Sequence, residues 1–334
     1  MRMKRIVFYY EEGIINDATS FYVSVIEKAA EKLSMVFCKT VTLKEIRYGD
    51  TILTIYSKNF IEAFLTHPFN KTIFWAQGVE PEEARLHCNK ITYWIKSLME
   101  YVSIKFSSLL FMVSNSMYEH YKKKYKLNRK HYVIMPCYNA DHISDVTLSK
   151  YANPTFVFAG GSSCWHCADE IIGTYKQIED AFPNASITLL SNAEKQFRCL
   201  LKRYNVKNYS IKYVPLSELQ YELAKYKYGF LLRNTHIINK VATPTKMSSY
   251  LGAGVIPVFT DAIDDFLNNI NLGEFTLLYK TPINKEEIAR SIIEFERSKH
   301  NYSEYIELVK NVFSDYYCTT KYINIISKEL KRIK

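Results

Sequence analysis

Short apolar runs alternate along the chain with longer segments whose apolar positions recur at helical spacing. Runs at residues 5–10, 51–55 and 109–113 are bounded by polar residues, which is typical of buried strands. In the segment 19–32 the apolar residues return at helical spacing, which predicts an amphipathic helix. Strands that alternate with helices favour a parallel sheet covered on both faces, so we expect an α/β fold.

The same alternation continues beyond a polar, irregular segment at residues 136–151. Strands are predicted at 154–159 and 228–232, again with helical segments between them. Because 334 residues exceed the size of one ordinary core, we expect two domains, residues 1–140 and 141–316, each built on a parallel sheet.

A helix start follows the predicted strand at 228–232. Thr243 is a typical N-cap residue and Pro244 suits the first helical position, so a helix is predicted from there to Gly254. A polar loop at 234–243 separates the strand from this helix.

Three cations lie close to this helix start in the sequence, namely Arg233, Lys240 and Lys246. Free N–H groups and the helix dipole converge with such cations, so we expect a dianion there, and the obvious one is a pyrophosphate. An ordinary α/β unit with solvated lysines and a surface ion pair at Arg233 fits the same pattern.

Gly160, Gly161 and Ser162 directly follow the predicted strand at 154–159. Paired glycines after a strand let the backbone approach a phosphate and supply N–H donors, although Gly-Gly also makes ordinary turns. Trp165, close behind, is a candidate for stacking on a sugar or base, or it covers the sheet.

One long helix is predicted over residues 85–105. Its apolar positions form a stripe: Ile91, Trp94, Ile95, Leu98, Met99 and Val102. Methionine and aromatic residues at this spacing are typical of a helix face that packs into the core.

A basic cluster with interleaved tyrosines follows the next predicted helix. It consists of Lys122, Lys123, Lys124, Lys126, Arg129 and Lys130. Such a cluster is a candidate for binding anionic lipid headgroups at a membrane surface. Cations near a helix C-terminus are also favourable to the helix dipole alone.

The composition limits the classes of partner that the protein is expected to bind. A formal charge of +10 fits a phosphorylated small molecule, an anionic lipid surface or nucleic acid, but no nucleic-acid-binding motif is present, so we expect no nucleic acid. No apolar run approaches the roughly 20 residues of a membrane span, and the basic start of the chain is interpreted as a first strand and not as a signal peptide.

Seven cysteines, an odd number, predict reduced thiols in a cytoplasm. Cys164 and Cys167 form the only tight pair and lack a second pair of ligands, so we expect no metal.

The stretch from Leu232 to Val258 also carries a family resemblance. The residues concerned are Leu232-Arg233, Asn239 to Lys246, Tyr250-Leu251, Ala253-Gly254 and Pro257-Val258. They resemble the donor-binding motif of GT-B fold glycosyltransferases, particularly GT4/GT1-like bacterial polysaccharide enzymes. The resemblance covers most of the C-terminal half, with weaker similarity before it. It implies two Rossmann-like domains facing a cleft and a C-terminal helix, residues 317–334, that packs back on the first domain.

The resemblance implies that this motif holds the diphosphate of a nucleotide sugar, with UDP or GDP as the expected nucleotide. The implied diphosphate-binding residues are Gly160, Gly161, Ser162, Arg233, Asn239, Lys240, Thr243 and Lys246. Arg233 and Lys246 are expected to be catalytic, since fixed cations stabilise charge on the leaving diphosphate. No cofactor is expected, because these cations would do the work of a metal.

For the nucleoside, the resemblance implies backbone contacts from Val214 and Pro215 to the base. Ser249 stands where the family usually has a glutamate that binds the ribose, and Val241 replaces the usual partner glutamate. Ser249 is therefore the expected ribose neighbour in place of a carboxylate.

Residues 77–83 resemble a family segment on the acceptor side of the cleft. Glu80 is the leading candidate for a general base that faces an acceptor hydroxyl. Competing carboxylates lie in an earlier loop: Glu11, Glu12 and Asp17. Gly13, Asp17 and Gln77 are expected on the acceptor side. Helix-dipole stabilisation alone also explains acidic residues at such a helix start.

Together these features predict a glycosyltransferase that moves a sugar from a nucleoside diphosphate sugar to a glycan or lipid-linked acceptor in bacterial surface polysaccharide synthesis. The expected location is the cytoplasm, with candidate peripheral contact on the inner face of the cytoplasmic membrane. A non-catalytic nucleotide-sugar-binding protein, and a nucleotide-sugar hydrolase or epimerase of the same architecture, are the alternatives.

Overall fold

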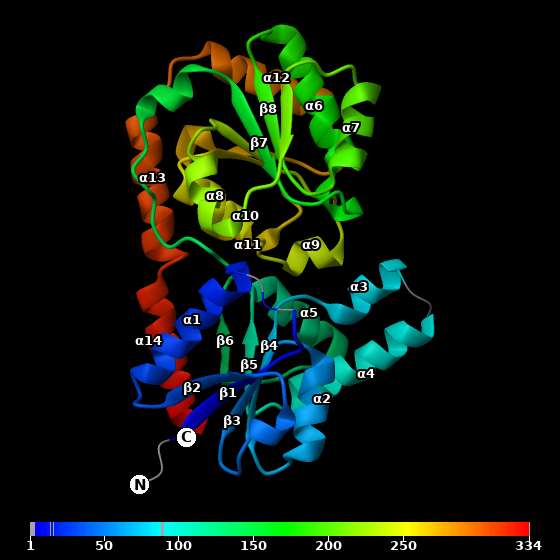
Figure 1. Ribbon diagram of the computed structural model, residues 1–334, viewed down its shortest axis with the longest axis vertical. Coiled ribbons are helices and arrows are strands. Elements are labelled where there is room, and N and C mark those ends of the chain that lie inside the picture. Colours follow the sequence, from blue (N-terminus) through cyan, green and yellow to red (C-terminus); the bar gives the residue numbers. More distant parts are fainter. Residues whose placement is uncertain (1–3, 14, 16, 88–89, 334) are drawn as a thin grey trace. The chain divides into compact units, whose positions relative to one another are not determined.

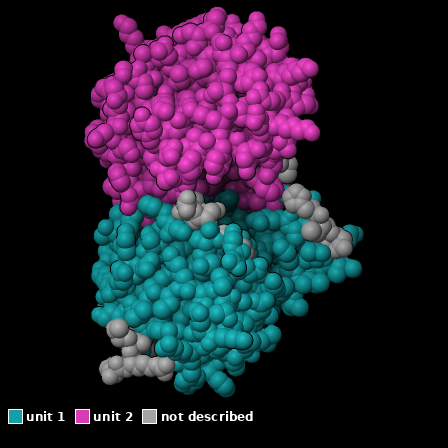
Figure 2. Space-filling view, viewed as in Figure 1, with its two compact units in different colours: residues 1–137, 240–243, 318–334 teal, residues 138–239, 244–317 magenta. Residues whose placement is uncertain are grey.

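The computed structural model describes residues 4–13, 15, 17–87 and 90–333 (Figure 1). The chain forms two compact units, coloured separately in Figure 2. Unit 1 comprises residues 1–137, 240–243 and 318–334, and unit 2 comprises residues 138–239 and 244–317. The backbone therefore passes from one unit to the other four times.

Unit 1 contains a parallel sheet of six strands within the described residues, in the order β2-β1-β3-β4-β5-β6. Its strands are β1 (Arg5–Tyr9), β2 (Val36–Thr40), β3 (Thr51–Thr54), β4 (Lys71–Ala76), β5 (Leu109–Met112) and β6 (Tyr132–Ile134). Its helices are α1 (Asp17–Glu31), α2 (Ser57–Thr66), α3 (Glu80–His87), α4 (Lys90–Phe106), α5 (Asn115–Tyr125) and α14 (Thr319–Ile333). The inner strands β1, β3, β4 and β5 are largely buried, as their apolar sequences require, whereas the edge strands β2 and β6 are only partly buried.

The last helix of the chain belongs to unit 1. The Ser327 hydroxyl of α14 donates to the Ala29 carbonyl of α1 at 3.1 Å, and both residues are buried. The C-terminal helix thus returns to the first sheet, which confirms that part of the fold prediction.

Unit 2 contains a second parallel sheet of six strands within its described residues, in the order β12-β11-β10-β7-β8-β9. Its strands are β7 (Thr155–Ala159), β8 (Ser186–Leu190), β9 (Tyr209–Lys212), β10 (Tyr228–Leu231), β11 (Ile256–Thr260) and β12 (Leu277–Tyr279). Its helices include α6 (Ala168–Ala181), α7 (Glu194–Arg203), α8 (Leu216–Leu223), α10 (Lys246–Gly252), α11 (Asp264–Asn269), α12 (Lys285–Arg297) and α13 (Tyr302–Asp315). The short α9 (Ile237–Val241) spans the point at which the chain enters residues 240–243.

The strand order of unit 2 fixes where a ligand can bind. β7 pairs with β8 on one side and with β10 on the other, so the winding of the chain reverses between β7 and β10. In doubly wound sheets the crevice for a ligand lies at the carboxyl ends of the strands at this reversal. The loops after Ala159 and after Leu231 are therefore the expected walls of a site.

Tyr250 anchors α10 over these two strands. A Cβ on Gly229 of β10 would lie 2.7 Å from the Tyr250 ring, so the glycine leaves the room that the ring occupies. The Tyr250 hydroxyl accepts from the Ala159 N–H at 3.2 Å and donates to the Phe230 carbonyl at 3.1 Å. One side chain thus ties α10 to both strands of the reversal.

The apolar stripe predicted to lie in the core does not do so. The single helix expected over 85–105 is two helices, α3 and α4, and α4 leaves Ile91, Trp94, Ile95 and Leu98 at the surface, between 55% and 70% exposed. The prediction was wrong because α4 packs through its polar residues instead, as described below. Within the described residues, no helix combines the length and the apolar character that a bilayer span needs.

Candidate functional site

Lys246 and Gly160 are in direct contact at the reversal point of unit 2. Gly160 follows β7, and a Cβ at this position would lie 2.5 Å from the Lys246 Nζ. The lysine comes from the first turn of α10, one turn before Tyr250, so the anchoring of Tyr250 fixes its position. Its ammonium lies 4.6 Å from the centre of the Phe158 ring, a cation–π contact from β7.

Arg233 lies at the end of β10 and is only 7% exposed. Its Nη1 donates to the Trp165 carbonyl at 2.6 Å, and its own backbone exchanges two hydrogen bonds with the Thr260 hydroxyl of β11. Burial lowers the pKa of Arg233 to about 10, which still leaves the guanidinium charged at neutral pH. The structure therefore holds a charged arginine rigidly at the carboxyl end of the sheet.

His166 completes a cluster of cationic and polar groups. Its Nδ1 lies 2.6 Å from the Gly161 carbonyl, so this nitrogen must carry a proton and donate it. Burial, followed by the charges of Lys246 and Arg233, lowers the pKa of His166 to about 3. The imidazole is thus neutral at neutral pH and keeps a lone pair on Nε2.

The cluster lacks a negative partner. Among the residues that the structure describes, no carboxylate lies within ion-pair distance of Arg233 or Lys246. Burial lowers the pKa of Lys246 well below its ordinary value, and the charge of Arg233 lowers it further. Two like charges held together in a protected place are costly unless an anion joins them. The geometry therefore suits an anionic ligand with at least two oxygens.

The neighbouring helix contributes less than its sequence indicated. α10 begins at Lys246 and not at Pro244, and it has only seven residues. The Thr243 hydroxyl does not cap it but accepts from the Cys137 N–H at 2.9 Å within unit 1. The Gly160 N–H likewise donates to the Leu190 carbonyl at 3.0 Å. Side-chain cations, more than backbone N–H groups, thus characterise this site.

The other residues expected at the diphosphate are placed less centrally. Asn239 is buried and its Nδ2 donates to the Asn234 carbonyl at 2.8 Å, which shapes the loop after β10. Lys240 is exposed and belongs to unit 1, whereas Ser162 is half-buried in unit 2 near Gly161.

Ser249 is engaged inside unit 2. Its hydroxyl lies 2.7 Å from the Asn139 Oδ1 and 3.1 Å from the Thr245 carbonyl, and the residue is 3% exposed. Val241, at the second position where the family has a glutamate, is fully buried and its carbonyl accepts from the Ser114 hydroxyl at 2.6 Å. Val214 and Pro215 lie just before α8, half-buried and exposed respectively.

Of the residues expected on the acceptor side, Gln77 lines a pocket in unit 1, together with the candidate base Glu80. The pocket has a volume of about 200 Å³ and lies at the carboxyl ends of β3 and β4; its lining is Ile55, Tyr56, Ala76, Gln77, Gly78, Glu80 and Glu83. The Gln77 Oε1 accepts from the Tyr22 hydroxyl at 3.2 Å. Gly13 is exposed in the loop after β1 with a φ of +78°. Asp17 begins α1, and its side chain lies outside the described residues.

Glu80 faces this pocket but has a structural partner too. Its Oε1 accepts from the Ser57 N–H at 2.7 Å and from the Ser57 hydroxyl at 2.9 Å, so it caps the start of α2. Burial raises the pKa of the neighbouring Glu83, and repulsion from Glu80 adds to the rise. Of the competing carboxylates, Glu11 pairs with Lys58 at 2.8 Å.

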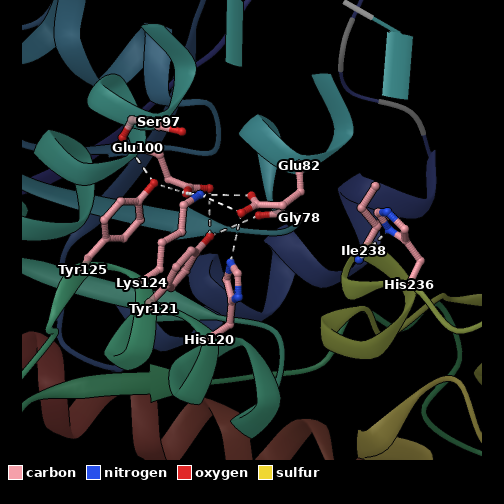
Figure 3. A network of polar contacts seen from close by, with 10 residues as sticks. All are labelled: Gly78, Glu82, Ser97, Glu100, His120, Tyr121, Lys124, Tyr125, His236 and Ile238. Atoms are coloured by element: carbon pink, nitrogen blue, oxygen red, sulfur yellow. Dashed lines mark hydrogen bonds and ion pairs between the residues drawn. The ribbon is translucent and has the colours of Figure 1, made fainter. Parts of the chain in front are cut away.

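A polar network beside this pocket joins α3, α4 and α5 (Figure 3). The Lys124 Nζ lies 2.8 Å from the Glu82 Oε1 and 3.1 Å from the Glu100 Oε2, and the Tyr125 hydroxyl donates to Glu100 at 2.6 Å. Burial raises the pKa of Glu100 to about 7, against the attraction of Lys124. The Tyr121 hydroxyl donates to the Gly78 carbonyl at 3.2 Å, which connects the network to the pocket.

This network changes the interpretation of the basic cluster. Lys124 is an internal ion-pair partner, and Arg129 donates to the carbonyls of Ile104, Ser107 and Ser108. Both side chains are thus structural. Lys122, Lys123, Lys126 and Lys130 remain exposed.

Sequence reasoning missed His166 as a site residue and Asn139 as a partner of Ser249. The motif around Cys164 and Cys167 drew attention to zinc instead, and within the described residues no group of three metal-ligating side chains is found. Cys167 is buried and accepts a weak hydrogen bond from the Asn234 Nδ2 at 3.5 Å.

No family model matches the sequence, and no curated protein matches it significantly. Solved structures do match. HepE from Anabaena, in complex with UDP-glucose, superposes with a TM-score of 0.73 at 11% identity, covering 98% of this chain and 99% of that one. Sucrose-phosphate synthase from Thermosynechococcus elongatus gives 0.69 at 10% identity, covering 99% and 98%. TarM from S. aureus, in a complex containing UDP, gives a TM-score of 0.65 at 9% identity. That match covers 87% of this chain but only 57% of the TarM chain.

The architecture and these likenesses agree. Each unit is a parallel α/β sheet with helices on its faces, and the last helix returns to the first unit. The chain therefore has the fold of the GT-B glycosyltransferases.

Proposed function

We propose that the protein transfers a sugar from a nucleoside diphosphate sugar to a hydroxyl acceptor. The observation that carries the proposal is the cluster of Lys246, Arg233 and Gly160 at the strand reversal of unit 2, where two cations lack a carboxylate partner among the described residues. The UDP and UDP-glucose complexes of TarM and HepE support a nucleotide sugar as the ligand.

The chemistry asks for stabilisation of a departing diphosphate. As the bond between the sugar carbon and the phosphate oxygen breaks, negative charge grows on that oxygen, and fixed cations lower the barrier. Lys246 and Arg233 would supply these cations. Asn239, Lys240 and Thr243, in the loop between them, and Gly161 and Ser162, in the loop after β7, would also contact the diphosphate.

The acceptor hydroxyl must lose a proton as it attacks. Glu80 is the candidate general base, since it lines the pocket of unit 1 and the Ser57 hydrogen bonds hold one of its oxygens in place. Gln77 and Gly13 would position the acceptor. Glu12 and Asp17 compete for the role of base, as does Glu11 if its pair with Lys58 opens.

For the nucleotide we propose UDP or GDP, with the base against Val214 and Pro215. Ribose recognition in this chain would differ from a paired-carboxylate scheme, because Ser249 and Val241 occupy those positions. For the acceptor we propose a glycan or a lipid-linked glycan of bacterial surface polysaccharide synthesis, with the protein in the cytoplasm. The exposed Lys122, Lys123, Lys126 and Lys130 would attract an anionic membrane surface, and Lys124 and Arg129 would take no part.

A thermal-shift panel of UDP, GDP, CMP, dTDP and ADP tests the donor site. A ligand that binds only the folded state raises the melting temperature, so one nucleoside diphosphate should stabilise the protein and Lys246→Ala should abolish the shift. Labelled nucleotide sugar with acceptor extracts then separates the functions. Sugar found on an acceptor supports transfer, free sugar points to a hydrolase, and binding without turnover points to a binding protein. No shift with any nucleotide would refute the donor site.

A further inference from the structure

Helix α4 exposes an apolar stripe and buries a polar one. Ile91, Trp94, Ile95 and Leu98 are 68%, 70%, 55% and 64% exposed, and they recur at the spacing of one helix face. Leu86 on the adjoining α3 is 44% exposed. In Figure 1 the outer part of α4 extends with α3 beyond the sheet of unit 1.

The opposite face of α4 explains this orientation. Ser97, Glu100 and Ser103 are buried, and Glu100 is held by Lys124 and Tyr125 of α5. The Ser97 carbonyl also accepts from the Tyr125 hydroxyl at 3.2 Å. These polar contacts fix the rotation of the helix about its axis, so the apolar stripe faces outward in the folded state. A surface helix normally has the reverse arrangement.

The charged side chains of α4 that reach the surface are all positive. Its charged residues are Lys90, Lys96, Lys105 and Glu100, and Glu100 is the buried one. Arg85 of α3 is also exposed, with its guanidinium 5.6 Å from the centre of the Tyr93 ring. Lys96 is half-buried, and its charge acts on Glu83 of α3. The exposed charges of α4, Lys90 and Lys105, are thus positive and accompany its apolar stripe.

We propose that the exposed stripe of α4, with Leu86, docks on an anionic lipid bilayer surface. A helix with aliphatic and Trp side chains on one face and lysines as its exposed charges lies in the interface of such a bilayer, with the apolar side chains among the acyl chains. The lysines gain from the negative headgroups. A second copy of the chain fits less well, because a symmetric pair of α4 stripes would set lysine against lysine.

This docking surface is distinct from the basic cluster on α5 and does not depend on sugar transfer. It places the insertion on apolar side chains, with charge as a second contribution. Binding should therefore fall with added salt but not vanish, unlike binding through lysines alone.

Co-sedimentation of the full chain with vesicles tests the proposal, using phosphatidylcholine alone or mixed with phosphatidylglycerol. The protein should pellet with the mixed vesicles. Trp94→Glu combined with Leu98→Glu should lower the binding constant by about tenfold or more, since burial of each apolar side chain contributes on the order of a tenfold change. Leu65→Glu, at an equally exposed leucine of α2 (72%), is the matched control and should leave binding unchanged.

Two further measurements guard the interpretation. The melting temperature of the double variant should match that of the parent, because both side chains lie at the surface in the folded state. Light scattering without lipid should give a monomer for both. If the parent is a dimer and the double variant a monomer, the proposal is overturned in favour of self-association. Equal pelleting of parent and double variant would overturn it as well.

Discussion

The ammonium of Lys246 occupies the space that any side chain on Gly160 would need. The separation of 2.5 Å between Nζ and an added Cβ is too short for real atoms, and the Gly160 φ of +152° is itself unfavourable for other residues. Glycine is therefore required here by the lysine, and the lysine is held close to the backbone by the glycine.

The first prediction concerns this pair. Gly160→Ala should push the ammonium away from β7 and weaken binding of the nucleoside diphosphate by about tenfold or more, as expected for misplacing one charge-stabilising group. Gly161→Ala is the matched control, because a Cβ there meets its nearest neighbour, a His166 ring atom, at 4.0 Å. Calorimetric titration of both variants with UDP and GDP checks the prediction. Equal affinities in the two variants would contradict it.

The second prediction sets activity against stability. The folded-state pKa of Lys246 lies well below its unfolded value, so the folded protein bears a cost at every pH below the unfolded pKa, and this cost shrinks as the pH rises toward it. Lys246→Met should therefore raise the melting temperature at neutral pH while it lowers turnover by well over tenfold. Thermal unfolding at several pH values and transfer assays measure the two effects. A less stable variant would show that the lysine is not desolvated as described.

The third prediction concerns the charge of His166. Its pKa of about 3 and the hydrogen bond from Nδ1 to the Gly161 carbonyl imply a neutral ring with one fixed tautomer. Nitrogen-15 NMR should show the Nδ1–H form, without titration above about pH 5. A ring that titrates at the ordinary histidine value would mean that His166 is not buried beside the charges of Lys246 and Arg233.

The fourth prediction separates the two roles of Glu80. Glu80→Gln keeps an oxygen that accepts from the Ser57 N–H, so the melting temperature should change little, while a general base would be lost and turnover should fall by about a hundredfold or more. Glu80→Ala removes the cap as well and should cost about 1 kcal/mol in the free energy of unfolding. Glu11→Gln is the control on the competing loop. If its turnover falls and that of Glu80→Gln does not, the base lies in the loop after β1.

The two parallel sheets could be predicted from the sequence, because short apolar runs between amphipathic segments are compatible with few other folds. The family resemblance placed Arg233, Lys246 and Gly160 at one ligand, and the structure has Lys246 in contact with Gly160. The prediction from the sequence was wrong on α4, because periodicity marks an apolar face without saying which way the face turns. That rotation is set by long-range contacts, such as those of Glu100 with Lys124 and Tyr125. The hydrogen bond between Ser249 and Asn139 could not be predicted for the same reason, because 110 positions separate the two residues.

The four passages of the backbone between the units have a practical consequence for dissection of the protein. Truncation after residue 137 would remove both the Val241 carbonyl that receives the Ser114 hydroxyl and the Thr243 oxygen that receives the Cys137 amide. A fragment that ends at residue 137 would therefore leave the Ser114 hydroxyl and the Cys137 N–H without these acceptors. A single cut of the chain therefore cannot separate unit 1 from unit 2.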